Sequence, residues 1–301
     1  SEWLVSKLYS LRVVVWITRR KEIQLAGGFR EALLILPFLK QFKADHPTTD
    51  LVLYYKDSDR QVNEVKDYLS NIPFIDALHP FSLVPKGERW DASRVARRNG
   101  GLVSPRHYQS ILDECFVKDD YTLAEKIWRK FGLSQKFVIV MHFDACSELI
   151  ESLYSLIQSC ASMKDEAVII AITDNASIEV DLSRPNTYVV KEKFLEKFGF
   201  RSILAMGQRA DLFIGGRTGL ECFFWLARTP SINFFDNEGF EEIRKGYWSV
   251  SFWEENPIVD GLVDMDTANI DELLSGMIIP RFRDWQQLHL LNDHAKTFSS
   301  P

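Results

Sequence analysis

Residues 210–230 of this chain read ADLFIGGRTGLECFFWLARTP: a short apolar run, a glycine turn and a second apolar run of helical length. We expect a buried strand that ends at Gly215 and Gly216, followed by a helix that begins near Thr218 or Gly219. Glycine lets the backbone approach a ligand closely, and the start of a helix presents unpaired N–H groups and a positive dipole end. This pattern favours an anion such as a phosphate. The residues of the predicted anion site are Gly216, Arg217, Thr218 and Gly219.

Length and composition indicate a globular α/β protein. The chain has 301 residues, 46% of them hydrophobic and 26% charged, which is typical of folded proteins and sufficient for two domains of ordinary size. Acidic residues outnumber basic ones by 42 to 36, and the net charge is −6. This balance argues against sequence-independent binding to a nucleic-acid backbone. We therefore expect no nucleic-acid partner and an anion site that is local.

The cysteines and the apolar runs favour a cytoplasmic location. The four cysteines form no C-x-x-C pair and no metal-ligand spacing with histidine, so we expect reduced thiols, no metal site and no cofactor. No run reaches the roughly 20 apolar residues that span a bilayer, and we expect no secretory signal. Residues 2–11 predict a short amphipathic helix that could contact a membrane peripherally, although packing on the N-terminal domain is the favoured alternative.

Predicted strands and helices alternate along the chain, and the alternation restarts after residue 134. In the first part we expect strands at 12–17, 22–26, 50–55 and 75–78 and helices at 31–44, 62–69, 91–98 and 119–131. We expect Asp91 to cap the helix at 91–98. In the second part we expect strands at 137–143, 167–173, 188–191, 210–215 and 231–235 and helices at 147–162 and 201–209. This order predicts two Rossmann-like domains, 1–134 and 135–301, with the ligand at the carboxyl ends of the strands. A single larger doubly wound domain is the alternative.

A second glycine turn stands near the other end of the chain. Residues 25–39 read LAGGFREALLILPFL, so Gly27 and Gly28 precede a helix whose first turn carries Glu31. This segment resembles the N-terminal turn of bacterial heptosyltransferase-like (family 9-like) glycosyltransferases of the GT-B type, and residues 210–230 resemble the diphosphate turn of their second domain. Residues 69–78, LSNIPFIDAL, are similar to a third segment of that family. A weaker similarity to fucosyltransferase-like GT-B enzymes lies at residues 173–175.

The resemblance implies a GT-B fold, in which two Rossmann-like α/β domains face each other across a cleft. The first domain would bind the acceptor, and the second would bind a nucleotide sugar. The implied reaction moves a sugar from a nucleotide diphosphate sugar to a hydroxyl of a glycan or glycolipid, with inversion and without a metal ion. A fucosyltransferase-like enzyme that uses a GDP-sugar and a catalytically inactive nucleotide-sugar-binding domain are the alternatives. We also expect a terminal helix after Pro280, which in many such proteins crosses back to the first domain.

The resemblance gives Glu31 the position of the catalytic base, because a carboxylate can take the proton of the acceptor hydroxyl. Without the resemblance, Glu31 is an ordinary first-turn glutamate that the helix dipole favours. Arg217 stands where the family carries an acidic or amide residue, and its guanidinium could hold phosphate oxygens in a bidentate manner. An ion pair with Glu221, four residues further on, is an equally good interpretation of Arg217.

Two further departures bear on activity. Arg30 replaces a glycine of the family's first turn, and residues 138–144 lack the lysine that the family carries shortly after this strand. Together with Arg217, these departures support the inactive alternative.

The remaining candidates lie in the predicted cleft and on the acceptor side. The residues that we expect near the nucleotide and sugar are Gly27, Gly28, Arg30, His142, Asp144, Thr173 and Asp174. A histidine at a strand end is more often satisfied by its surroundings, which is the other interpretation of His142. The acceptor candidates are Arg94, Arg97 and Arg98. These arginines could bind an anionic acceptor, or they could form only a solvated helix face.

Overall fold

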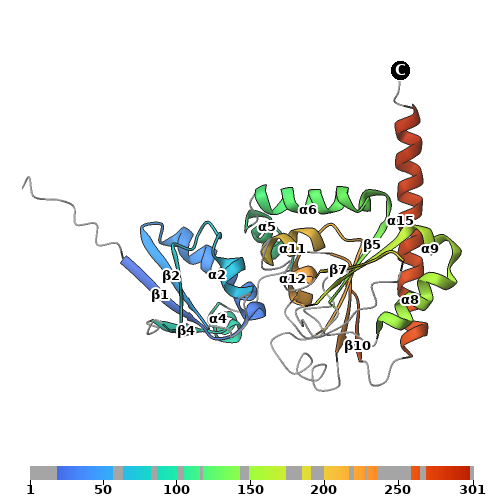
Figure 1. Ribbon diagram of the computed structural model, residues 1–301. Coiled ribbons are helices and arrows are strands. Elements are labelled where there is room, and N and C mark those ends of the chain that lie inside the picture. Colours follow the sequence, from blue (N-terminus) through green and yellow to red (C-terminus); the bar gives the residue numbers. More distant parts are fainter. Residues whose placement is uncertain are drawn as a thin grey trace, which may run out of the picture.

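The computed structural model of this protein shows two α/β units, each built on its own parallel sheet (Figure 1). The structure describes residues 19–56, 64–82, 87–99, 105–115, 118–142, 149–173, 185–190, 200–216, 220–227, 229–235, 259–264 and 269–298. The predicted strand at 12–17 and the predicted amphipathic helix at 2–11 lie outside these residues. The statements below concern the described part of the chain.

The first unit contains a four-stranded sheet in the order β3-β2-β1-β4, and each neighbouring pair is parallel. Its elements are β1 (Arg19–Leu25), α2 (Phe29–Asp45), β2 (Thr49–Tyr55), α3 (Glu64–Leu69), β3 (Ala77–Pro80), β4 (Glu88–Trp90) and α4 (Ala92–Arg98). All of these elements except β4 were predicted, to within a few residues at their ends. The β-α-β order read from the sequence is confirmed here.

The apolar spacing of α2 explains how this unit forms its core. Leu33, Leu36 and Leu39 recur at helical intervals and are fully buried, together with the sheet residues Ile23 and Leu53. The edge strand β4 depends on a glycine instead. Gly87, which precedes β4, has a φ of +88°, and a Cβ there would overlap the backbone of Glu22. Only glycine therefore lets β4 approach β1 at this point.

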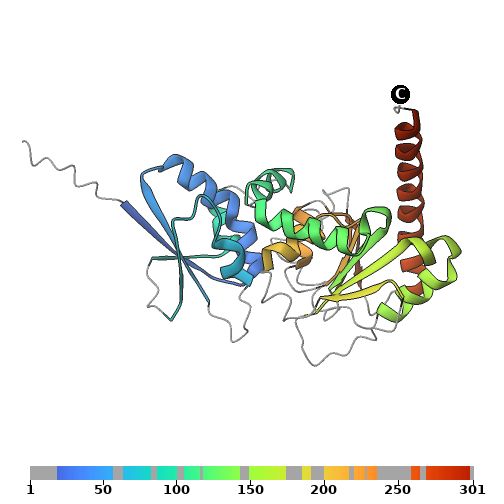
Figure 2. The same ribbon diagram turned by 45° about the horizontal axis from the view of Figure 1, so that its top comes forward.

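Two helices connect the units. They are α5 (Pro105–Cys115) and α6 (Lys118–Lys130), and a short 3₁₀ turn at Leu133–Gln135 follows them. α5 contacts α2 of the first unit and α12 of the second, and the Tyr108 hydroxyl donates to the backbone oxygen of Leu34 over 2.7 Å. α6 packs on α11 and lies along the second unit in both ribbon views (Figures 1 and 2). The predicted domain boundary at residue 134 lies between the last strand of the first sheet and the first strand of the second, and it stays a prediction.

The second unit contains a six-stranded parallel sheet in the order β10-β9-β8-β5-β6-β7. Its elements are β5 (Phe137–His142), α8 (Leu149–Ser159), α9 (Ala161–Glu166), β6 (Ala167–Ile172), β7 (Thr187–Val190), α11 (Phe200–Gly207), β8 (Leu212–Gly215), α12 (Leu220–Leu226), β9 (Ser231–Phe235), β10 (Val259–Asp264) and α15 (Ile270–Phe298). The strand order reverses between β8 and β5, as in doubly wound sheets.

Alternate residues of the central strand β5 serve two different cores. Val138 and Val140 belong to a core that continues without interruption into the first unit. Phe137, Ile139 and Met141 face the other side, where α8 and α15 cover the sheet. The two units therefore share one of their hydrophobic cores.

The terminal helix differs from its prediction. It begins at Ile270 rather than at Pro280, which lies inside the helix. Its packing is on the second unit: Phe282 and Trp285 contact the ring of Phe137 at 5.5 and 6.0 Å between centroids, edge to face. Both ribbon views show α15 on the side of this unit far from the first sheet, with its C-terminal half extending outward (Figures 1 and 2).

Candidate functional site

The turn between β1 and α2 brings Glu31 to the carboxyl end of the first sheet. The N–H of Ala26 donates over 2.8 Å to the backbone oxygen of Trp90, which ties this turn to the end of β4. A Cβ on Gly27 would overlap the Cγ of Glu31, whereas the Cβ position of Gly28 is open space. The absence of a side chain on Gly27 therefore lets the Glu31 side chain fold back over the turn.

The carboxylate of Glu31 lies at the start of a different helix, α4. Its Oε2 accepts the N–H of Ala92, the first residue of α4, over 2.7 Å. The N-cap residue Asp91 accepts the N–H of Arg94 over 2.7 Å, as the sequence predicted for an N-cap. Together the two carboxylates satisfy two N–H groups at one helix end, so Glu31 does more than interact with its own helix dipole.

Burial raises the pKa of Glu31. The hydrogen bond from Ala92 acts in the opposite direction, the nearby Asp91 charge raises the pKa further, and the charge of the half-buried Arg30 lowers it. A carboxylate with a raised pKa is a stronger proton acceptor than an ordinary glutamate, which suits a general base that works near neutral pH.

The second glycine turn follows β8 as predicted. β8 ends at Gly215, Gly216 is buried, and α12 begins at Leu220. A Cβ on Gly215 would overlap the ring of Phe213. The strand and the helix on either side of the predicted anion site are thus confirmed. Three of its four residues lie outside the described part of the chain, so their contacts stay a prediction: Arg217, Thr218 and Gly219.

The helices that follow the two turns pack against each other. Phe29, the first residue of α2, stacks on Phe223 of α12, with ring centroids 6.4 Å apart and planes 24° apart. Figure 1 shows α2 and α12 at the junction of the two units. Phe29 follows Gly28 directly, and Phe223 lies about 4.5 Å along the axis from the first residue of α12. Gly28 and the first turn of α12 therefore lie close to this junction.

The carboxyl edge of the second sheet gathers other predicted residues. β8, β5 and β6 are neighbours, with Met141 opposite Ile214 and His142 opposite Ile172. His142 ends β5 and is 3% exposed, and Thr173 follows β6 and is 1% exposed. His142, Thr173 and Gly216 therefore lie side by side at the carboxyl ends of adjacent strands. Two other predicted cleft residues lie outside the described part of the chain: Asp144 and Asp174.

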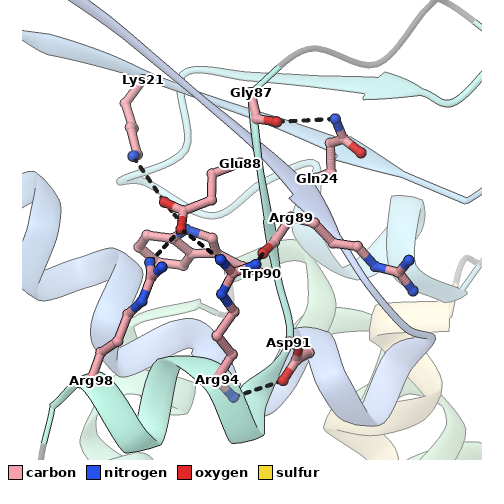
Figure 3. Close-up of polar contacts among 9 residues, drawn as sticks. All are labelled: Lys21, Gln24, Gly87, Glu88, Arg89, Trp90, Asp91, Arg94 and Arg98. Carbon is pink, nitrogen blue, oxygen red and sulfur yellow. Dashed lines mark hydrogen bonds and ion pairs between the residues drawn. The ribbon is translucent and has the colours of Figure 1, made fainter.

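The predicted acceptor arginines form part of a polar cluster around Glu88 (Figure 3). Arg98 forms an ion pair with this carboxylate, and Lys21 and Arg94 lie 3.5 and 3.7 Å from it. The indole N–H of Trp90 donates to it over 3.2 Å. The hydrogen bonds from Arg98 and Trp90 lower the pKa of Glu88, so it stays ionised. Three cations share one carboxylate here, which leaves the cluster with a formal excess of positive charge.

Two other arginines lie on or near α4. Arg97 is exposed on α4. Arg89 extends to the opposite side of β4 from Glu88 in Figure 3, the side on which Gln24 donates to the Gly87 backbone oxygen over 3.1 Å. The structure thus brings Arg94 and Arg98 together, one helical turn apart, on a common carboxylate.

Some features that could mark other activities were not found in the described part of the chain. No helix there is both long and apolar enough to cross a membrane. Nor do the described residues contain a group of three or more His, Cys, Asp or Glu side chains placed to hold a metal ion. A surface hollow between α8 and α15 is lined by Glu151, Ser152, Ser155, Leu156, Ser159 and Asp271.

Comparison with solved structures identifies the architecture. The structure is similar to that of an E. coli ADP-heptose LPS heptosyltransferase II, with a TM-score of 0.51 at 7% sequence identity, over 88% of this chain and 98% of that one. The protein has the GT-B fold. The expectation of two facing Rossmann-like units is confirmed. At this level of sequence identity the likeness assigns the fold alone. The activity has to be inferred from the residues of the site.

Two other solved proteins show weaker likeness to this GT-B chain. A family 9 glycosyl transferase from Veillonella parvula matches with a TM-score of 0.49 at 11% identity, over 72% of this chain and 81% of that one. A Bradyrhizobium fucosyltransferase matches with a TM-score of 0.36 at 13% identity, over 69% of this chain and 93% of that one. No protein-family model matches the sequence, and no curated protein sequence matches it.

Sequence reasoning missed the partners of the predicted site residues. Ala92 holds Glu31 through its backbone N–H, and a backbone donor has no signature in the residue type. Glu88 and Lys21 lie in strands, where their approach to Arg94 depends on the pairing of β1 with β4. The i, i+4 spacing of Arg94 and Arg98 was the one available signal that these two side chains point the same way.

Proposed function

We propose that this protein is a glycosyltransferase that moves a sugar from a nucleotide diphosphate sugar to a hydroxyl of a glycan or glycolipid. One observation carries the proposal. Glu31, a carboxylate with a raised pKa, stands in the first turn of a helix that packs directly on the helix after the second glycine turn. In a GT-B fold this pairing sets a proton acceptor beside an anion site.

The second unit supplies the donor site in this proposal. Backbone N–H groups of residues 216–219 bind the diphosphate, and Arg217 neutralises charge as the bond to the leaving oxygen breaks. His142 and Thr173 line the adjacent carboxyl edge of the sheet. Together with Asp144 and Asp174, they bind the nucleotide and the sugar. The E. coli protein of the same fold is named for ADP-heptose, which supports a nucleotide sugar as the donor class.

The first unit supplies the base and the acceptor in this proposal. Glu31 takes the proton of the acceptor hydroxyl while the oxygen attacks the anomeric carbon from the face opposite the diphosphate, so the configuration inverts. Gly27, Gly28 and Arg30 form the wall of the site next to the base. Arg94, Arg97 and Arg98 bind the acceptor. The donor phosphates are stabilised by protein groups, without a metal ion.

Two alternatives remain, each with a feature in its favour. A nucleotide-sugar-binding domain without activity is favoured by the contact of Glu31 with α4, since a carboxylate that caps a helix is useful without catalysis. Arg30 and Arg217 also depart from the resembling family. A fucosyltransferase-like enzyme with a GDP-sugar donor is favoured by the weaker similarity at residues 173–175.

A panel of nucleotide sugars with different bases and sugars tests the proposal. Binding is measured by thermal shift, because a ligand at 100 times its dissociation constant adds about 2.7 kcal/mol of stability. Each donor that binds is then incubated with hydroxyl acceptors, and release of the nucleoside diphosphate is followed. Donor-dependent release supports the enzyme, binding without release supports the inactive domain, and no binding to any member contradicts both.

A further inference from the structure

Arg201, the second residue of α11, is buried among groups from other elements. It is 5% exposed. Its Nε and NH2 donate to Oδ2 of Asp120 over 3.2 and 3.1 Å, and its NH1 donates to the backbone oxygen of Tyr68 over 2.6 Å. NH2 also donates to the backbone oxygen of Cys115. One guanidinium therefore binds α3, α5 and α6 at once.

Each of these partner groups lies at a helix end whose dipole favours the charge that is found there. Tyr68 and Cys115 lie in the last turns of α3 and α5, where carbonyl groups lack helical partners and the dipole favours a cation. Asp120 lies in the first turn of α6, where the dipole favours an anion. Because α3 belongs to the first unit and α11 to the second, Arg201 joins the two units through a hydrogen-bonded buried network.

A second polar interaction runs between the same two helices, again from α11 to α3. Burial raises the pKa of Asp67 in α3, and the backbone N–H of Phe200 acts on this carboxylate in the opposite sense. Both interactions have their donor in α11 and their acceptor in α3, at adjacent residues of each helix. Together they hold the start of α11 against the end of α3.

The aromatic contacts beside Arg201 reach the helices that follow both glycine turns. Phe200 packs edge to face on Phe29, with ring centroids 4.9 Å apart, and Phe29 stacks on Phe223 of α12. Phe29 begins the helix that carries Glu31, and Phe223 lies in the helix after the donor turn. A displacement of α11 would therefore be transmitted by direct packing to both sides of the site.

We propose that Arg201 is a positioning residue, which holds the two units in the one relation that sets Glu31 against the donor turn. The catalytic part of this inference rests on the proposed function, whereas the fixed relation of the units does not. A misplacement of about 1 Å can lower a reaction rate about 100-fold. The donor turn lies wholly within the second unit, so loss of Arg201 lowers kcat and leaves the KM for the donor unchanged.

The test compares two variants with a matched control. Arg201→Met removes every hydrogen bond of the guanidinium, and Arg201→Lys keeps the charge but cannot bind Asp120 and both carbonyl groups together. Arg209→Met is the control, because Arg209 follows the same helix and forms an exposed ion pair with Glu125 at 3.9 Å. Spin labels on unnatural amino acids at two exposed positions, Gln41 in α2 and Glu151 in α8, report the distance between the units.

The wild type and Arg209→Met should show the same narrow distance distribution, and Arg201→Met should show a broader one. With a donor from the nucleotide-sugar panel, Arg201→Met should lower kcat about 10- to 100-fold at unchanged donor KM, and Arg201→Lys should recover part of the loss. A narrow distribution in Arg201→Met overturns the fixed relation. A broad distribution with unchanged kcat overturns the positioning role.

Two failures can be distinguished from these outcomes: a variant that does not fold, and a wild type that binds no donor. If Arg201→Met does not fold, Arg201→Lys carries both measurements, with the same expected directions and the same overturning results. If no nucleotide sugar binds the wild type, the proposed function fails and the catalytic part of the inference fails with it. The distance measurement then still decides whether Arg201 joins the units.

Discussion

The Glu31 carboxylate and the Ala92 N–H lie 2.7 Å apart, although 61 residues separate them in the sequence. The contact joins the first turn of α2 to the first residue of α4. Because these helices follow the paired strands β1 and β4, it links two adjacent strand ends of the first sheet. The proposed base therefore has a fixed place that does not depend on a bound substrate.

Replacement of Glu31 by glutamine tests its role as the base. In Glu31→Gln the side-chain oxygen can still accept the Ala92 N–H, so we expect an unchanged melting temperature and unchanged donor affinity. The rate constant should fall by about 10²–10⁴-fold, the usual contribution of a general base. Since the pKa of Glu31 is raised, wild-type activity should decline as the pH falls through a value above 4.5. A near-normal rate constant in Glu31→Gln would leave Glu31 as a structural contact of α4.

The two glycines of the first turn should differ in their response to alanine. In Gly27→Ala the new Cβ overlaps the Glu31 side chain, so we expect about 1–3 kcal/mol of destabilisation and a displaced carboxylate. Gly28→Ala adds a Cβ in open space, and its effect should stay below about 1 kcal/mol. Urea unfolding of the two variants provides the comparison. Equal effects would contradict the steric account of Gly27.

Arg217 should contact the donor diphosphate. Arg217→Ala is expected to cost roughly 1.5–3 kcal/mol in donor binding or transition-state stabilisation, with little change in folding. Arg217→Lys restores the charge without the bidentate fork and should fall between the wild type and alanine. Titration calorimetry with the donor measures the effect. A lowered melting temperature with unchanged affinity would favour the ion pair with Glu221.

Chelation should leave activity intact. In the proposed mechanism, protein groups stabilise the charge of the leaving diphosphate, so turnover in the presence of a chelator should equal that in its absence. The measurement is nucleoside diphosphate release before and after treatment with the chelator. Loss of release that Mg²⁺ or Mn²⁺ restores would refute the metal-independent mechanism.

Asp211 should make stability depend on pH. Burial raises the pKa of Asp211 to about 6, against an ordinary value of 3.8, although its carboxylate accepts the Val138 N–H over 2.7 Å. Its folded form therefore prefers the proton, and its contribution to stability is complete below pH 3.8 and lost as the pH rises to about 6. That loss amounts to about 3 kcal/mol.

The matched variant is Asp211→Asn, whose amide oxygen can still accept the Val138 N–H. We expect this variant to be more stable than the wild type at pH 7 and to lack this part of the pH dependence. Other buried carboxyl groups with raised pKa values contribute in the same direction, so the difference between the two proteins is the quantity to measure. An equal dependence on pH in both would show that Asp211 titrates normally.

The sequence predicted the elements whose signals are local. The apolar run of β8, the glycines after it and the spacing of α12 all lie within 210–230, so this strand, turn and helix could be read together. Asp91 was predicted as an N-cap, and its contact with Arg94 confirms it. For the same reason Gly27 and Glu31 could be placed in one turn.

Two of the elements that were missed or misplaced depend on distant contacts. The short strand β4 carries two charged residues and Trp90 and has no apolar alternation, so only its pairing with β1 makes it a strand. Pro280 predicted a helix start, but the helix α15 continues through this proline. Proline has no N–H, so one backbone hydrogen bond is lost there, and packing of Phe282 on Phe137 maintains the helix. The charge cluster at Glu88 was missed because it, too, depends on the pairing of β4 with β1.

The core that both units share has a consequence for biosynthesis. The first-unit residues Phe29 and Tyr68 are covered by Phe200 and Phe223, which the ribosome adds more than a hundred residues later. Until then the nascent first unit presents an apolar surface that its own sheet cannot cover. Chains usually fold domain by domain from the N-terminus during translation, but this one must keep that surface from aggregating until most of its length has emerged. Chaperone demand should therefore be greatest before residue 223 leaves the exit tunnel.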